Sequence, residues 1–86
     1  MTAGVKEQVI RWRSPHTSPK YDGKAEVVMS TVEMNNGTRY IDIRIRKTAE
    51  HPKGEGFTGK GMRILPDQAL SLQKALNHVL SEWSED

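Results

Sequence analysis

The sequence of 86 residues contains no cysteine, and aromatic residues make up only 6% of it. Without cysteine, neither a disulfide nor a cysteine-based zinc site can hold the fold together, and a small domain without disulfides fits a reducing compartment better than secretion. No apolar run approaches the roughly 20 residues that span a bilayer, and the N-terminus lacks an apolar signal-peptide segment. The sequence therefore predicts a soluble intracellular protein, located in the cytoplasm or nucleoid if its source is bacterial or viral and in the nucleus if it is eukaryotic.

The patterns that most enzymes and metalloproteins need are also missing. The three histidines are far apart, no two have the helical spacing of a metal site, and the serines and carboxylates form no nucleophile motif. Residues 54–60 satisfy much of the glycine pattern of dinucleotide-binding and phosphate-binding loops, but a strand-like segment and a proline follow them instead of a helix. We therefore expect no enzymatic activity, no metal and no cofactor, and an enzyme or nucleotide binder built on this loop is the weakest of three functional hypotheses.

Charge is abundant and unevenly distributed. Residues 1–65 carry twelve Lys and Arg against seven Asp and Glu, a net charge of +5, whereas residues 66–86 carry one Lys against four acids, a net charge of −3. This asymmetry suggests a cationic binding surface on the first part of the fold and a different role for the C-terminal part. The chain is long enough for one domain, and a domain of this size leaves much apolar surface uncovered unless it self-associates.

Hydrophobic periodicity predicts several strands before a single helix. We expect a short strand at residues 9–13, a proline-containing loop at 14–23, and a hairpin whose strands, 25–34 and 39–47, flank the turn at Asn36 and Gly37. Residues 48–61 are expected to be a glycine-rich loop with at most a very short piece of strand, and residues 61–65 to be a short strand. We accordingly divide the chain into an N-terminal extension, residues 1–24, and a main domain, residues 25–86.

A helix is expected to begin at Pro66, because proline at the first helical position wastes no hydrogen bond and Asp67 suits the positive end of the helix dipole. Leu65 offers no side-chain acceptor to cap it. Apolar residues then recur at spacings of three and four over more than four turns. One small sheet cannot cover such a stripe, so we expect a homodimer with the helix in its interface. The interface residues would be Leu72, Leu76, Val79, Leu80 and Trp83.

Residues 39–47 alternate aliphatic with polar side chains, and most of the polar ones are cationic. Period-two alternation places Ile41, Ile43 and Ile45 on one face of the strand and the side chains of even-numbered residues on the other. We expect the isoleucines to face a core and the opposite face to meet water or an anionic partner. Asp42 would repel phosphate, so we expect it to pair with a neighbouring arginine.

Cations on these strands and in the glycine-rich stretch could form a track for a nucleic-acid backbone, with aromatic side chains for base stacking. The candidate nucleic-acid-binding residues are Arg11, Trp12, Arg13, Arg39, Tyr40, Arg44, Arg46, Lys47, Phe57, Lys60 and Arg63. Packing roles remain open for the aromatic candidates, and a solvated strand face remains open for the arginines.

Residues 36–44, followed by 58–68, resemble the positive cofactor 4 family of transcriptional coactivators. The likeness covers about residues 25–83, and its best parts are residues 41–44 and the stretch from Gly59 to Gly61 with the strand and Pro66 after it. The resemblance implies a curved antiparallel sheet of about four strands backed by a C-terminal helix, an α+β fold paired through its helices into a homodimer. It also implies single-stranded DNA binding over the basic sheet face, with Arg44 and Lys60 at positions that contact the strand.

The chain departs from the family pattern where family members often carry an aromatic residue, at Lys47 and Ala69, and residues before 25 have no counterpart. The leading hypothesis is thus a coactivator-like protein that binds single-stranded DNA or RNA with little sequence specificity and serves transcription, replication or repair with other proteins of those processes. The missing aromatics favour the alternative, a protein-interaction adaptor of the same fold without strong nucleic-acid binding.

Overall fold

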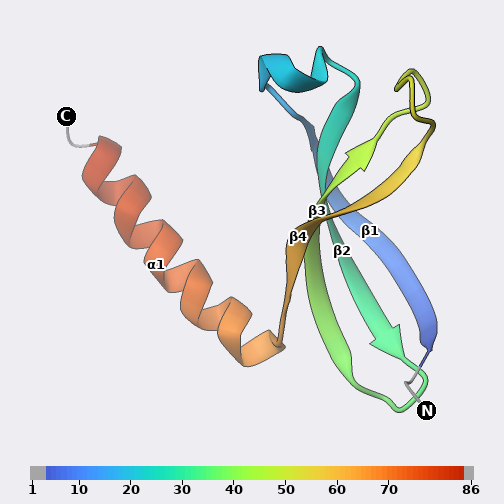
Figure 1. Ribbon diagram of the computed structural model, residues 1–86. Helices are drawn as coiled ribbons and strands as arrows, with labels where there is room; N and C mark the ends of the chain where they lie inside the picture. Colours follow the sequence, from blue (N-terminus) through green and yellow to red (C-terminus); the bar gives the residue numbers. More distant parts are fainter. Residues whose placement is uncertain (1–3, 85–86) are drawn as a thin grey trace.

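The computed structural model describes residues 4–84 and shows a four-stranded sheet followed by one helix (Figure 1). The sheet contains β1 (Val5–Pro15), β2 (Ala25–Met34), β3 (Arg39–Lys47) and β4 (Gly56–Ile64), in that order and with every neighbouring pair antiparallel. The helix, α1, spans Pro66–Ser84, and a short 3-10 helix, η1 (Pro19–Tyr21), lies between β1 and β2. The predicted α+β class and order of elements are confirmed, and the homodimer stays a prediction.

The predicted hairpin joins β2 to β3. The backbone N–H of Met34 donates to the carbonyl of Thr38 over 2.8 Å, and Glu33 pairs with Arg39 in the ladder. Gly37 has a φ of 88°, a conformation that glycine adopts without strain. The turn therefore fixes the register of the two central strands. This register continues without a shift from the pair Glu33 and Arg39 to the pair Ala25 and Lys47.

Two strands are longer than predicted. β1 begins at Val5 instead of residue 9 and pairs along its length with β2, so residues 5–15 are a strand of the same sheet. β4 begins at Gly56, so the loop predicted for residues 48–61 is wrong in its second half. Phe57 pairs with Arg46 there, and the hydroxyl of Thr58 donates to the carbonyl of Ile45 over 2.8 Å. Pairing with β3 overrides the weak strand propensity of this glycine-rich stretch.

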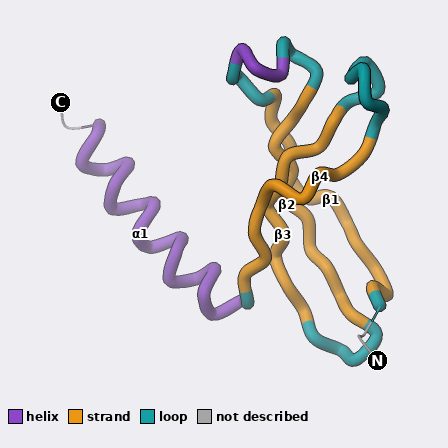
Figure 2. Tube along the Cα trace, in the orientation of Figure 1, coloured by secondary structure: helices purple, strands orange, loops and turns teal. Residues whose placement is uncertain are grey.

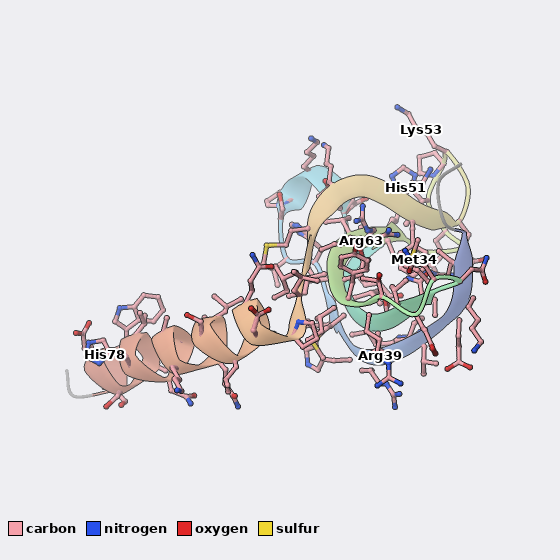
Figure 3. All side chains as sticks on the ribbon, turned by 90° about the horizontal axis from the view of Figure 1, so that it is seen from below. Met34, Arg39, His51, Lys53, Arg63 and His78 are labelled. Carbon is pink, nitrogen blue, oxygen red and sulfur yellow. The ribbon has the colours of Figure 1, made fainter. Side chains whose placement is uncertain are left out.

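The sheet is strongly curved, and its two faces differ. We define the inner face by the four residues whose side chains it buries completely: Val28, Ser30, Val32 and Asp42. Figure 3 shows Met34 and Arg63 within the curve of the sheet and Arg39 outside it. The outer face carries Met29, Ile41, Ile43 and Ile64, which are half-buried and line a groove facing α1.

This arrangement reverses the expected environment of Asp42. Asp42 does not face water, because it is 0% exposed, whereas Ile41 and Ile43, which were expected to face a core, are only half-buried. Strand periodicity assigns residues to two faces but does not say which face the curvature will close. The prediction that the face of Asp42 is open is therefore wrong for Asp42 itself.

The helix begins at Pro66 as predicted, and it is better capped than expected. The side-chain oxygen of Gln68 accepts the backbone N–H of Leu65 over 2.9 Å, and the first helical hydrogen bond runs from Ala69 to Leu65. In Figures 1 and 2, α1 diverges from the sheet after this first turn. No residue of α1 is buried, and no helix within residues 4–84 has the length and apolar character that crossing a membrane requires.

Candidate functional site

The centre of the inner face is an ion-paired cluster around Asp42. Its carboxylate accepts hydrogen bonds from the Arg44 guanidinium at 2.7–3.0 Å and from Arg63 at 3.2 Å, which confirms the expected pairing with a neighbouring arginine. Burial raises the pKa of this carboxyl, but the hydrogen bonds and charges of Arg44 and Arg63 lower it by more. The pKa of Asp42 is therefore below its ordinary value. Asp42 is therefore held ionised.

Most of the hydrogen bonds that Arg44 can donate are made within this cluster. It also donates to the backbone carbonyl of Thr58 at 3.1 Å, and only 17% of its side chain is exposed. Arg63 is paired with the same carboxylate but remains 42% exposed. Of these two predicted phosphate contacts, Arg63 has guanidinium surface available to a ligand, while Arg44 mainly ties β3 to β4.

A second set of ion pairs lies farther along the inner face. Glu26 pairs with Arg13 at 3.4 Å and with Arg46 at 3.5 Å, and Arg46 also donates to Glu55 at 2.6 Å. The pKa of Arg46 is accordingly raised, chiefly by its hydrogen bond to Glu55. Arg46 is thus neutralised locally by two carboxylates, whereas the side chain of Arg13 on the edge strand is 62% exposed.

Phe57 is the aromatic residue that best fits a stacking role. It lies on edge strand β4, directly opposite Arg46 in the ladder, and the Arg46 guanidinium carbon is 5.7 Å from its ring centroid. Its exposed fraction is 42%. One side of the ring therefore rests on a cation while part of its surface remains open. Lys60 and Arg63 follow on the same strand and are also exposed.

The predicted residues do not form one continuous track, because they divide between the two faces. Trp12 pairs with Met29, and the guanidinium of Arg11 donates to the hydroxyl of Thr31 at 3.2 Å, which places both on the outer face. Arg39 and Lys47 alternate with the inner-face residues of β3 and belong to the outer face as well. The inner face and β4 bring together Arg13, Tyr40, Arg44, Arg46, Phe57 and Arg63.

Three of the five predicted interface residues of the helix, Leu72, Leu76 and Leu80, line an apolar groove, and Val79 and Trp83 do not. The groove, of about 330 Å³, runs between the outer face of the sheet and α1. Its helix wall is formed by Ala69, Leu72, Gln73, Leu76, Asn77 and Leu80. Leu76 and Leu80 are 52% and 57% exposed, and Trp83 near the end of the stripe is 69% exposed.

Sequence reasoning missed the residues that surround these side chains. Glu26 could have been found, because the Asn36–Gly37 turn sets a register in which Glu26 lies opposite Arg46. Glu55 carried no signal: it belongs to the loop before β4, yet its carboxylate accepts a hydrogen bond from Arg46 at 2.6 Å. That contact depends on tertiary structure alone.

The histidines occupy three separate places. His16 packs its ring edgewise on Tyr21 with 4.6 Å between centroids, His51 accepts the backbone N–H of Lys53, and His78 lies 3.0 Å from Glu82 on the helix. Within residues 4–84, no three side chains of the metal-ligating kind converge. Comparisons with protein-family models, curated protein sequences and solved structures found no match to the chain.

Proposed function

We propose that this protein binds single-stranded DNA or RNA as a homodimer and acts as a coactivator-like protein in transcription or a related process. The observation that carries the proposal is the exposed ring of Phe57 resting on the Arg46 guanidinium, with exposed Lys60 and Arg63 on the same edge strand. The resemblance to the positive cofactor 4 family supports the same function from the sequence side.

The chemistry of this surface suits an unpaired strand. A base can stack on the open part of Phe57 whatever its identity, and cations beside it can accompany the backbone phosphates. The polar side-chain atoms of Arg44 and Asp42 already form hydrogen bonds within the protein. Few groups are therefore left to read base edges. Binding would therefore depend on backbone charge and stacking and show little sequence preference.

Dimerisation would complete the protein on its other face. The groove between α1 and the sheet is lined almost entirely by apolar side chains, and the helix stripe beside it is half-exposed. A second copy related by a two-fold axis would place the same helix stripe against the same groove, which is the self-complementary arrangement of a symmetric dimer. The outer face would then be covered while the exposed side chains of β4 remained available.

The test is a fluorescence-anisotropy titration of the wild-type protein with labelled oligothymidylate of roughly 20 nucleotides, longer than the 4–16 nucleotides that a single-strand site usually covers. With about four to six phosphate contacts, we expect a slope of log affinity against log salt of about −3 to −4. Absence of measurable binding at low salt, or affinity that does not change with salt, would contradict the proposal.

The adaptor function is the second candidate, and one observation favours it. Arg44 and Arg46, the two arginines at the centre of the predicted track, are both engaged by carboxylates. If no oligonucleotide binds while the protein remains dimeric, the remaining exposed surface would serve protein partners.

A further inference from the structure

The outer face of the sheet contains a cavity besides the apolar groove. The cavity, of about 400 Å³, is lined by residues of β1, β2 and β3, and Ile41 lines both it and the groove. Its volume falls within the roughly 300–1,000 Å³ of sites that hold small organic molecules, so it can admit one large side chain. Pro66, the first residue of α1, also lines it. The cavity is therefore adjacent to the groove and lies at the start of the helix.

The lining of the cavity combines apolar surface with charges of both signs. Ile41 and Pro66 contribute apolar atoms, and the charged residues of the lining are Glu7, Arg11, Glu33 and Arg39. The guanidinium of Arg11 donates to the hydroxyl of Thr31 at 3.2 Å, which holds it over the outer face. Guanidinium groups stack on aromatic rings, and carboxylates accept hydrogen bonds from an indole N–H. Such a lining suits tryptophan, which has a large apolar ring and one donor.

Trp83 is a side chain of this kind that one chain leaves uncovered. It is 69% exposed, more than any other large apolar side chain among residues 4–84, and it does not line the groove. Trp83 and Pro66 lie at opposite ends of α1, whose 19 residues span about 28 Å at 1.5 Å per residue. The helix also diverges from the sheet (Figure 1). Trp83 therefore lies far from the cavity of its own chain.

The charges of α1 favour one order of two paired helices. The last turn of α1 contains Glu82 and no basic residue, and an acid at the negative end of the helix dipole is unfavourable. Parallel helices would bring two such ends together. Antiparallel helices related by a two-fold axis place each acidic end beside the start of the other helix. There it meets the cavity with its exposed Arg11 and Arg39.

We propose that Trp83 of each chain fills the outer-face cavity of a second copy, with its ring beside the guanidinium groups of Arg11 and Arg39. This inference rests on the proposed homodimer and deepens it, because it names the anchoring side chain, the cavity that receives it and the antiparallel order of the helices. Tryptophan is prominent among the few residues that dominate the binding energy of interfaces, and these residues fill pockets of the partner.

Sedimentation equilibrium of single variants tests the anchor. Trp83→Ala should weaken dimerisation roughly 30-fold or more, as truncation of a dominant interface residue does. Leu70→Ala is the matched control, because Leu70 is 54% exposed on the same helix but does not line the groove. The control should stay within about twofold of the wild type. A Trp83→Ala variant that dimerises like the control would overturn the inference.

A double-mutant cycle tests whether Trp83 occupies this cavity. Thr31→Phe places a ring in the cavity and should weaken dimerisation roughly 5- to 150-fold. Val27→Phe is its control, because Val27 is half-buried on the same face of β2 but lines neither the cavity nor the groove. Adding Trp83→Ala should weaken the Thr31→Phe dimer little further but should have its full effect on Val27→Phe. Thermal melts should show every variant folded.

The outcomes separate this inference from the proposed function. A dimeric wild type in which Thr31→Phe and Trp83→Ala act additively would overturn the inference and leave the homodimer in place, whereas a monomeric wild type would overturn both. A non-additive cycle in a protein that binds no oligothymidylate would support the inference and contradict nucleic-acid binding.

Fluorescence gives an independent measurement. Since the chain has two tryptophans, Trp12→Phe leaves Trp83 as the only reporter. Its emission should shift to shorter wavelengths as the concentration rises and dimers form. An emission that stays at the wavelength of exposed tryptophan in the dimer would also overturn the inference.

Discussion

At the level of single residues, the inner face is organised by Asp42. A fully buried carboxylate is costly unless it is paired and hydrogen-bonded, and here two guanidinium groups supply both interactions. Since Arg44 lies on β3 and Arg63 on β4, the carboxylate joins the last two strands of the sheet. Arg44 therefore serves the fold first, and reversing its charge would damage folding together with any binding.

Replacing Asp42 by Asn should lower the free energy of unfolding by roughly 2 to 4 kcal/mol at pH 7, because two guanidinium groups would lose their charged partner. The folded-state pKa of Asp42 is depressed, so its stabilisation is fully present above the unfolded value near 4 and is lost as the pH falls through the folded value. The stability difference between wild type and variant, measured by urea unfolding, should therefore shrink below about pH 4. The exposed Asp22→Asn is the control and should change stability little. A difference between wild type and Asp42→Asn that is independent of pH would contradict the assignment.

Gly61 permits the close approach of β4 to β3. A methyl group at this position would overlap the Cβ of Arg44 and the carbonyl oxygen of Ile43, and it would lie 2.6 Å from the Arg44 Cα. Gly59, two residues earlier, has nothing within 4 Å of the same methyl position.

Gly61→Ala should thus destabilise the protein by roughly 1 to 3 kcal/mol or more through overpacking, whereas Gly59→Ala should be close to neutral. Thermal unfolding of the two variants measures the difference. Equal melting temperatures would show that the two strands do not approach as closely as described.

At the level of elements, the sequence predicted correctly those features that depend on interactions between neighbouring residues. The Asn36–Gly37 turn and the helix start at Pro66 were found because each depends on a few adjacent residues. The first half of β4 was missed because its pairing comes from β3, and the closing of the polar face around Asp42 was missed because curvature belongs to the whole sheet. For the candidate site, periodicity placed Arg44 and Arg46 on one face, but periodicity alone could not show that Arg46 meets Glu26 on β2 and Glu55 just before β4.

The two exposed aromatic residues of the edge strands should differ in function, because they lie on opposite faces of the sheet. Replacing Phe57 by Leu removes the stacking surface on β4 and should weaken single-strand binding by about 1 to 3 kcal/mol, or roughly 5- to 150-fold. Trp12→Leu, on the outer face, is the matched comparison and should have a much smaller effect. Anisotropy titration of both folded variants checks this. A larger loss for Trp12→Leu would move the binding surface to the outer face.

At the level of the whole molecule, the apolar stripe of α1 is the surface that a single chain leaves exposed to solvent. Leu76, Leu80 and Trp83 are each more than half-exposed along α1, and the groove beside them is apolar. Burial of such surface between two copies would be favourable at about 25 cal/mol per Å² of apolar area before the cost of association.

Light scattering should give the mass of two chains for the wild type at micromolar concentration. Leu76→Glu should yield monomer or unfolded chain, because it places a charge in the apolar interface. Lys74→Glu, on an exposed part of the same helix, should remain dimeric and shows that an added acid alone does not dissociate the protein. A wild-type mass of one chain would contradict the dimer.

The most direct test of single-strand binding is a comparison of one labelled DNA strand alone and the same strand annealed to its complement, both titrated with wild-type protein at two salt concentrations. The proposal predicts tighter binding to the single strand at both concentrations, because bases in a duplex are stacked away from Phe57 and a stiff duplex follows a curved sheet poorly. It also predicts that both affinities fall as salt rises. Equal affinity for the two forms, or tighter binding to the duplex, would contradict the proposal.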